Sequence, residues 1–217
     1  MTKQKSKKTL FVYRTARGKV YRDWQKGQGP DSLLFGANHL AKMGYQIDFF
    51  DSGYSPFNIF HPFLYPLEHS IINTVGMGFK LDQALYLLPR LNNYDVIVGT
   101  GDSAGLPLLA LKYAGLLKQP IIFMTSGLAG ALKGKNKTWA FNFYKKILPL
   151  ADVFTSYAQV EIDFFEKEMG IKRGKITYMP LATDWVYFSR KSQPKADRPL
   201  DENIKRNVIC SVGVESG

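Results

Sequence analysis

The chain has 217 residues, of which 45% are hydrophobic, 22% charged and 14% aromatic; this is a globular composition, sufficient for one large domain or one domain and part of another. The single cysteine, Cys210, excludes a disulfide framework within the chain, and no apolar run approaches the roughly eighteen residues of a membrane span. The net charge of +11 indicates attraction to polyanions such as nucleic acid, anionic lipid or phosphorylated small molecules. We expect a cytoplasmic protein, either free or peripheral at the inner face of the membrane.

The first part of the chain predicts a β-loop-α-β unit behind a basic tail at residues 1–8. Residues 9–13 are expected to form a buried strand, and residues 14–30 a polar loop that contains Gly27 and Gly29. Pro30 and Asp31 are typical of a helix start. The helix is expected to end at Gly44, before a second strand at residues 45–50. Its apolar residues recur at helical spacing: Leu33, Leu34, Ala37, Leu40 and Ala41.

Residues 52–90 are rich in aromatics and prolines and are expected to form a lid or loop over a groove, with a helix only at 79–88. After this segment, apolar runs predict an alternation of strands and helices, with a glycine-rich turn at 126–134. Such alternation is typical of a Rossmann-like, doubly wound parallel α/β sheet, in which ligands lie at the carboxyl ends of the strands. The expected strands are 94–99, 120–125, 152–156 and 175–179, and the expected helices are 105–115, 138–150 and 160–169.

The clearest candidate for chemistry is the run Gly99-Thr-Gly-Asp102-Ser103-Ala-Gly105, between an expected strand and an expected helix. Amides at such a helix start can hold a phosphate. The spacing departs from G-x-G-x-x-G, and no carboxylate follows about twenty residues later, so a tight turn without a dinucleotide is favoured. Asp102 either caps the helix or acts as a general base at the ligand edge.

The three histidines are His39, His61 and His69. His39 lies in the first expected helix and is interpreted as structural. His61 and His69 lie in the aromatic segment, and either is a catalytic candidate, with His61 preferred. No H-x-x-x-H pattern or Cys/His cluster indicates zinc, so no metal is expected.

Lysines surround the aromatic helix expected at 138–150, with no acidic residue between them. This pattern fits docking on anionic lipid, or an ordinary sheet-covering helix with a basic outer face. No nucleic-acid-binding module is recognisable, so nucleic acid is not expected as a partner. The lysines are Lys133, Lys135, Lys137, Lys145 and Lys146.

Several segments together resemble the family-4-like (group 1) glycosyltransferases of GT-B fold. The most specific are Ala151-Asp-Val-Phe-Thr-Ser156 and Lys175-Ile-Thr-Tyr-Met-Pro-Leu-Ala-Thr-Asp184-Trp-Val-Tyr-Phe188. The helix ending Leu-Ala-Lys-Met-Gly44-Tyr-Gln-Ile-Asp and the run Tyr94-Asp-Val-Ile-Val also match. The sequence departs from the family at Ala182-Thr183, and at Ser126-Gly127, where the family often has histidine.

The resemblance implies the acceptor-side half of an enzyme that transfers a sugar from a nucleotide-sugar to an acceptor, with a lipid-linked acceptor as one hypothesis. It implies no cofactor beyond that donor substrate. The residues expected to contact substrate are Gly27, Gly29, Ser103, Ser126, Gly127 and Asp184, with Asp102 and His61 as catalytic candidates.

The predicted domain limits are 9–188 for the Rossmann-like domain, 189–206 for a charged linker and 207–217 for the first strand of a donor-binding domain that is cut off. The donor domain would have to be supplied in cis, so the chain alone is expected to be inactive. Two other functions remain open: a non-catalytic module that binds a nucleotide or anion, and an NAD(P)-dependent oxidoreductase domain built on residues 99–105.

Overall fold

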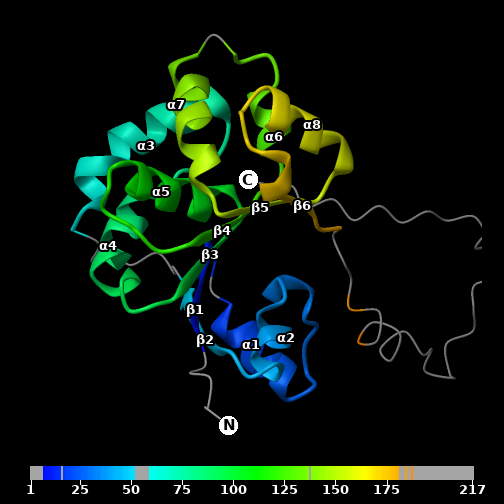
Figure 1. Cartoon of the computed structure of the whole chain (residues 1–217). Helices are drawn as coiled ribbons and strands as arrows, with labels where there is room; N and C mark the ends of the chain where they lie inside the picture. The colour runs from blue at the N-terminus through cyan, green and yellow to red at the C-terminus, as the bar shows by residue number, and fades with distance from the viewer. Residues whose placement is uncertain are drawn as a thin grey trace, which may run out of the picture. The chain divides into compact units, whose positions relative to one another are not determined.

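The structure is a computed structural model that describes residues 7–15, 17–51, 59–136, 138–180, 184 and 187. The chain divides into two compact units, residues 1–183 and 184–217, which are treated separately. The first unit carries the sheet and its helices (Figure 1). The predicted linker at 189–206, the predicted strand at 207–217 and most of the basic tail lie outside the described residues.

A six-stranded parallel sheet forms the centre of the first unit, in the order β2-β1-β3-β4-β5-β6. The α/β Rossmann-like fold expected from the sequence is therefore confirmed. The direction of chain progression reverses between β1 and β3, which makes the carboxyl ends of these strands the topological switch point, where such sheets bind ligands. The strands are β1 Lys8–Tyr13, β2 Gln46–Asp51, β3 Val96–Thr100, β4 Ile121–Met124, β5 Val153–Ser156 and β6 Ile176–Tyr178.

Side chains alternate between the two faces of the sheet, and each face has its own core. In β1, Leu10 and Val12 belong to the larger core, whereas Phe11 and Tyr13 belong to the smaller one. The larger core is covered by α3 His61–Val75, α4 Leu81–Leu91, α5 Asp102–Tyr113, α6 Leu128–Leu132, α7 Trp139–Ile147 and α8 Gln159–Lys167. The opposite face carries α1 Gly18–Gln25, η1 Ser32–Leu34 and α2 Ala37–Lys42 (Figure 1).

The helix expected between Pro30 and Gly44 is interrupted. The 3-10 helix η1 ends at Leu34, and α2 begins three residues later. Between them Phe35 and Gly36 adopt positive φ angles of 51° and 85°, which no α-helix accommodates. The hydroxyl of Tyr13 donates to the carbonyl oxygen of Leu34 at 2.9 Å and fixes the end of η1 against the sheet.

The prediction of an irregular segment at 52–78 is wrong for its described part, because α3 fills residues 61–75. Pro62 lies in the first turn, where a missing amide hydrogen costs nothing, and only Pro66 lies inside the helix. The loop expected at 14–30 likewise contains α1, and the turn expected at 126–134 contains the short helix α6. Among the described residues, no helix has the length and apolar character needed to cross a bilayer.

Candidate functional site

The start of α4 is fixed to the switch point of the sheet. The Gln83 side chain donates to the carbonyl oxygen of Tyr13, at the end of β1, at 3.3 Å. The amide of Lys80 donates to the carbonyl oxygen of Ser103, in the first turn of α5, at 3.1 Å. A Cβ on Gly78 would lie 2.5 Å from the hydroxyl oxygen and 3.1 Å from the Cβ of Ser103, so a larger residue here would force Ser103 to shift. The α3–α4 connection therefore lies directly against the end of the sheet.

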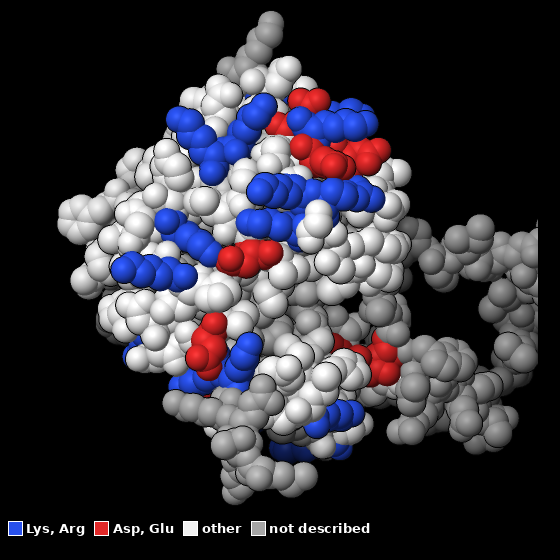
Figure 2. All heavy atoms as spheres, viewed as in Figure 1, with Lys and Arg blue, Asp and Glu red and all other residues white. Residues whose placement is uncertain are grey.

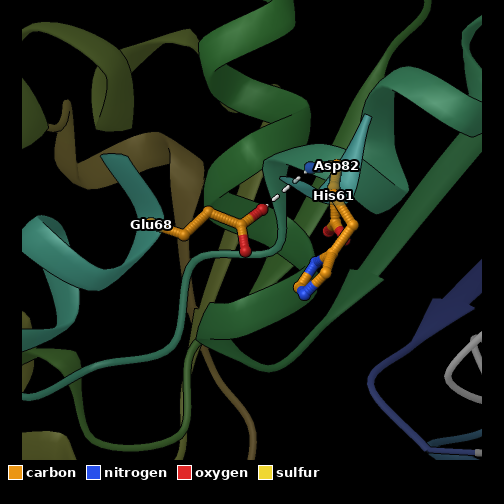
Figure 3. Close-up of side chains that lie close together, drawn as sticks. All are labelled: His61, Glu68 and Asp82. Atoms are coloured by element: carbon orange, nitrogen blue, oxygen red, sulfur yellow. Dashed lines mark hydrogen bonds and ion pairs between the residues drawn. The ribbon is translucent and has the colours of Figure 1, made fainter. Parts of the chain in front are cut away.

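His61, Glu68 and Asp82 converge at this point, and we call them the His61 cluster (Figure 3). His61 Nδ1 lies 2.8 Å from Asp82 Oδ2, and the amide of Asp82 donates to Glu68 Oε1 at 2.9 Å. The other Asp82 oxygen, Oδ1, accepts from the amide of Gln83 at 2.7 Å. The aspartate is thus held on both oxygens, with one of them directed at the imidazole of a histidine whose side chain is 26% exposed.

The two carboxylates of the His61 cluster are buried: Glu68 is 2% exposed and Asp82 is 7% exposed. Burial, with a smaller contribution from the neighbouring negative charge of Asp82, raises the pKa of Glu68 to about 7. Lys80 Nζ lies 3.9 Å from Glu68 Oε2 and compensates the charge only in part. The cluster combines one nitrogen base with two carboxylates in a setting that favours an added positive charge.

Asp102, Thr125 and Ser126 form a second group at the carboxyl edge, which we call the Asp102 cluster. Asp102 is 2% exposed, and it accepts from the Thr125 hydroxyl at 2.7 Å, from the Ser126 amide at 3.2 Å and from the Ser126 hydroxyl at 3.1 Å. Burial raises the pKa of Asp102 to about 6, against the opposing effect of these three donors. The carboxylate joins the first turn of α5 to the segment after β4.

Further hydroxyl groups lie near this edge. Burial, and secondarily the charge of Asp102, raises the pKa of Tyr144 far above its usual range and that of Tyr157 to about 12. Among the described residues, the hydroxyl oxygens of Tyr144, Thr155 and Tyr157 have no hydrogen-bond partner. Both tyrosines therefore stay neutral and are able to donate a hydrogen bond but not to act as bases.

The glycines at 99 and 105 serve packing. A Cβ on Gly99 would lie 2.6 Å from the Cα of Gly105, and a Cβ on Gly105 would lie 2.2 Å from the Phe123 ring. Helix α5 therefore contacts β3 and β4 through bare backbone. The Asp102 carboxylate already occupies the start of α5, where a phosphate would meet a like charge. These contacts favour the tight-turn interpretation over a dinucleotide site.

The remaining predicted substrate residues are scattered. The amide of Gly27 donates to Trp24 and the amide of Gln28 to Asp23, so the loop with Gly27 and Gly29 caps the carboxyl end of α1, an end that disfavours anions. Gly127 precedes α6. Asp184 belongs to the second unit, where its Oδ1 accepts from the amide of Tyr187 at 3.0 Å.

Of the predicted substrate residues, Ser103 lies at the α3–α4 connection and Ser126 contacts Asp102. The sequence does not indicate Glu68 and Asp82 as site residues. His61 and Glu68 are seven residues apart, which is two turns of a helix. This spacing places both side chains on one face of α3, and it is a usable signal only once residues 61–75 are known to be helical. His69 lies outside the cluster and stacks on Tyr65, with ring centroids 5.5 Å apart. His39 pairs with Asp31 at 3.3 Å.

No protein-family model matches the chain, and the comparison with curated proteins finds no match. Among solved structures, the chain is similar to Alr3699/HepE of Anabaena, solved in complex with UDP and glucose, with 9% identity and a TM-score of 0.43 over 81% of this chain and 44% of that chain. It is also similar to sucrose-phosphate synthase from Thermosynechococcus elongatus, with 12% identity and a TM-score of 0.41 over 85% of this chain and 95% of that one. The chain thus spans less than half of the HepE chain.

Proposed function

We propose that this chain is the acceptor-side domain of a GT-B glycosyltransferase that uses a nucleotide-sugar as donor. The observation that carries the proposal is the His61–Asp82 pair at the β1/β3 switch point, the edge where doubly wound sheets bind ligands. The family-like segments at 151–156 and 175–188 support it, since they contain β5 and β6 in the expected order.

His61 is the general base in this proposal. It accepts the proton of an acceptor hydroxyl as that oxygen bonds to the anomeric carbon of the donor sugar, while the bond from that carbon to the diphosphate oxygen breaks and the nucleoside diphosphate leaves. Asp82 orients the imidazole and stabilises the imidazolium, while Glu68 positions Asp82 through its backbone amide. The half-buried imidazole remains within reach of solvent, which an acceptor needs.

Asp102, the other catalytic candidate, is less suited to proton transfer. Its carboxylate is 2% exposed and is occupied by three donors from Thr125 and Ser126. We therefore propose that Asp102 fixes the edge of the sheet on which Ser126 and Gly127 lie, and that His61 alone exchanges the proton. The donor is a substrate, and no organic cofactor is part of the proposed reaction.

A lipid-linked acceptor at an anionic membrane is the finer part of the proposal. Ile59, Phe63 and Leu67 are 71%, 82% and 44% exposed and recur every four residues, so they form an apolar stripe along the α3 region that also carries His61. Helix α7, with exposed Lys145 and Lys146, packs beside α3. Figure 2 shows Lys and Arg gathered on the part of this face that carries α7 and α8, with acidic side chains among them. Such a surface suits anionic lipid headgroups.

Turnover of nucleotide-sugars tests the enzymatic proposal. The native protein that contains this chain is given a panel of UDP- and GDP-sugars, and release of the nucleoside diphosphate is measured. We expect donor-dependent release that His61→Ala lowers by about 100-fold or more, with His69→Ala as the control. Binding of a nicotinamide cofactor instead, or unchanged turnover in His61→Ala, would refute this assignment.

Vesicle sedimentation tests the membrane proposal. We expect binding to phosphatidylserine vesicles at low salt, weakening as salt screens the lysines. Phe63→Glu is expected to abolish binding, whereas Met43→Ser, at an exposed apolar position just after α2 on the opposite face of the sheet, leaves it unchanged. Absence of binding to anionic vesicles at low salt would rule the surface out.

A further inference from the structure

The His61 cluster also has the composition of a metal site. One imidazole nitrogen and two carboxylate oxygens, one from each residue, all lie within 4.8 Å of one another. Bonds of about 2.0 Å to a tetrahedral ion place neighbouring ligand atoms roughly 3.3 Å apart. His61 Nδ1 and Asp82 Oδ2 are already closer than this, at 2.8 Å. Only the Glu68 carboxylate has to approach, by a movement within the range of its side-chain torsions.

The backbone holds these ligands in place before any ion arrives. His61 and Glu68 lie two turns apart on α3, and Asp82 lies in the first turn of α4. The amide of Asp82 donates to Glu68 Oε1, and Figure 3 shows the Glu68 carboxylate on the side of the cluster opposite His61 and Asp82. Preorganised ligands on rigid elements reduce the conformational entropy lost on binding.

The buried negative charge of the His61 cluster also favours a bound cation. Buried carboxylates are costly unless cations or hydrogen bonds compensate them. Asp82 is held by His61 and by the Gln83 amide, whereas Glu68, 2% exposed, receives one hydrogen bond within the described part of the chain, from the Asp82 amide. The nearest ammonium group among the described residues is that of Lys80, 3.9 Å from Glu68 Oε2 and beyond hydrogen-bond distance. The Lys80 side chain is 32% exposed and can turn to solvent when a divalent cation replaces it.

We propose that His61, Glu68 and Asp82 bind one divalent transition-metal ion of the zinc class. The imidazole ligand selects against Mg²⁺ and Ca²⁺, which prefer all-oxygen sites, and favours Zn²⁺ and Co²⁺. Three protein ligands leave a fourth position for water, as in zinc sites that are not purely structural. This inference rests on the geometry of the cluster and does not depend on the proposed transferase reaction.

Metal binding and proton transfer compete at His61. An imidazole that ligates a cation is not available as a general base. If the proposed reaction also holds, Zn²⁺ is expected to inhibit turnover in wild-type protein, and a chelator is expected to restore it.

Co²⁺ titration of the tag-free 217-residue chain tests the proposal directly. We expect saturable visible absorption with one ion per chain, displaced by Zn²⁺, and a rise in the melting temperature at saturating metal. His61→Ala is expected to weaken binding by about 100-fold or more, and Glu68→Gln by at least about 10-fold. His69→Ala, on the same helix but outside the cluster, leaves binding unchanged.

Circular dichroism of each variant shows whether it has folded, and Glu68→Gln keeps an acceptor for the Asp82 amide in case His61→Ala does not fold. Absence of saturable Co²⁺ or Zn²⁺ binding to wild-type protein would overturn the site. Wild-type affinity in folded His61→Ala or Glu68→Gln would overturn it as well, because the ion would then lie elsewhere. Neither outcome bears on nucleotide-sugar turnover, which the transferase assay measures separately.

Discussion

The Asp102 cluster and the His61 cluster lie at the same edge of the sheet, and both bury a carboxylate whose pKa is raised, to about 6 for Asp102 and to about 7 for Glu68. They differ in what surrounds the charge. Asp102 receives three donors from neighbouring loop residues, whereas Glu68 receives one amide and faces a second carboxylate and a histidine. Burial therefore raises both pKa values, whereas the donors and charges around the two carboxylates differ.

Removing the Asp102 carboxylate gives the largest expected effect. Asp102→Ala leaves the Thr125 hydroxyl and the Ser126 amide without their acceptor in a buried place, so we expect a loss of about 3 kcal/mol in the free energy of unfolding. Urea denaturation measures the loss, with Asp163→Ala on the surface of α8 as the control. A loss below about 1 kcal/mol would show that the Asp102 cluster is not structural.

The bare backbone contact beside Asp102 is the next target. Gly105→Ala places a methyl group 2.2 Å from the Phe123 ring, and we expect a loss of about 2 kcal/mol from overpacking. Gly130→Ala in α6 is the matched control, since its new Cβ meets nothing within 4 Å. Equal stability of the two variants would mean that α5 does not pack tightly against β4.

The pH dependence of stability sharpens the comparison for Asp102. Its folded pKa of about 6 lies above the unfolded value of about 3.9, so between these pH values the folded state binds more protons. The contribution of Asp102 to stability is therefore complete below about pH 4 and lost as the pH rises to about 6. We expect the difference in unfolding free energy between wild type and Asp102→Asn to shift by roughly 2 to 3 kcal/mol across this window, in favour of the variant at high pH. A difference that is constant with pH would contradict the raised pKa.

His61 gives the smallest expected effect on stability. Its side chain is partly exposed, and Asp82 still accepts the hydrogen bond from the Gln83 amide when the imidazole is removed. We expect His61→Ala to cost about 1 kcal/mol or less in urea denaturation while it removes metal binding. A loss of unfolding free energy as large as that of Asp102→Ala would show that His61 is a structural residue, and that the two clusters do not differ in their contribution to stability.

The sequence predicts the sheet far better than the site. The strands are short apolar runs between turns, and all of those within the described residues appear within two residues of their predicted limits. The sequence does not predict helix α3, because Pro62 and Pro66 are typical of a loop, although the first of them suits a helix start. Without α3, the register that brings Glu68 beside His61 cannot be predicted.

Asp82 illustrates a different limit. It lies within the predicted helix at 79–88, but its partner is 21 residues away on another helix, and local patterns carry no information on such a pairing. The glycines of residues 99–105 are a different case, because the sequence already favours a tight turn there and the structure supplies its reason, a packing requirement between α5, β3 and β4. Tertiary contacts, which local sequence patterns do not encode, determine both the pairing of Asp82 with His61 and the role of the glycines.

The contact of Gly78 and Lys80 with Ser103 has a consequence for motion. The Lys80 amide and the Ser103 carbonyl tie the residue before α4 to the first turn of α5, so a ligand that shifts one helix start displaces the other. Asp102 and Asp82 each lie within two residues of that hydrogen bond. We therefore expect the Co²⁺ affinity of the His61 cluster to change in Ser126→Ala, and an unchanged affinity would show that the two clusters act independently.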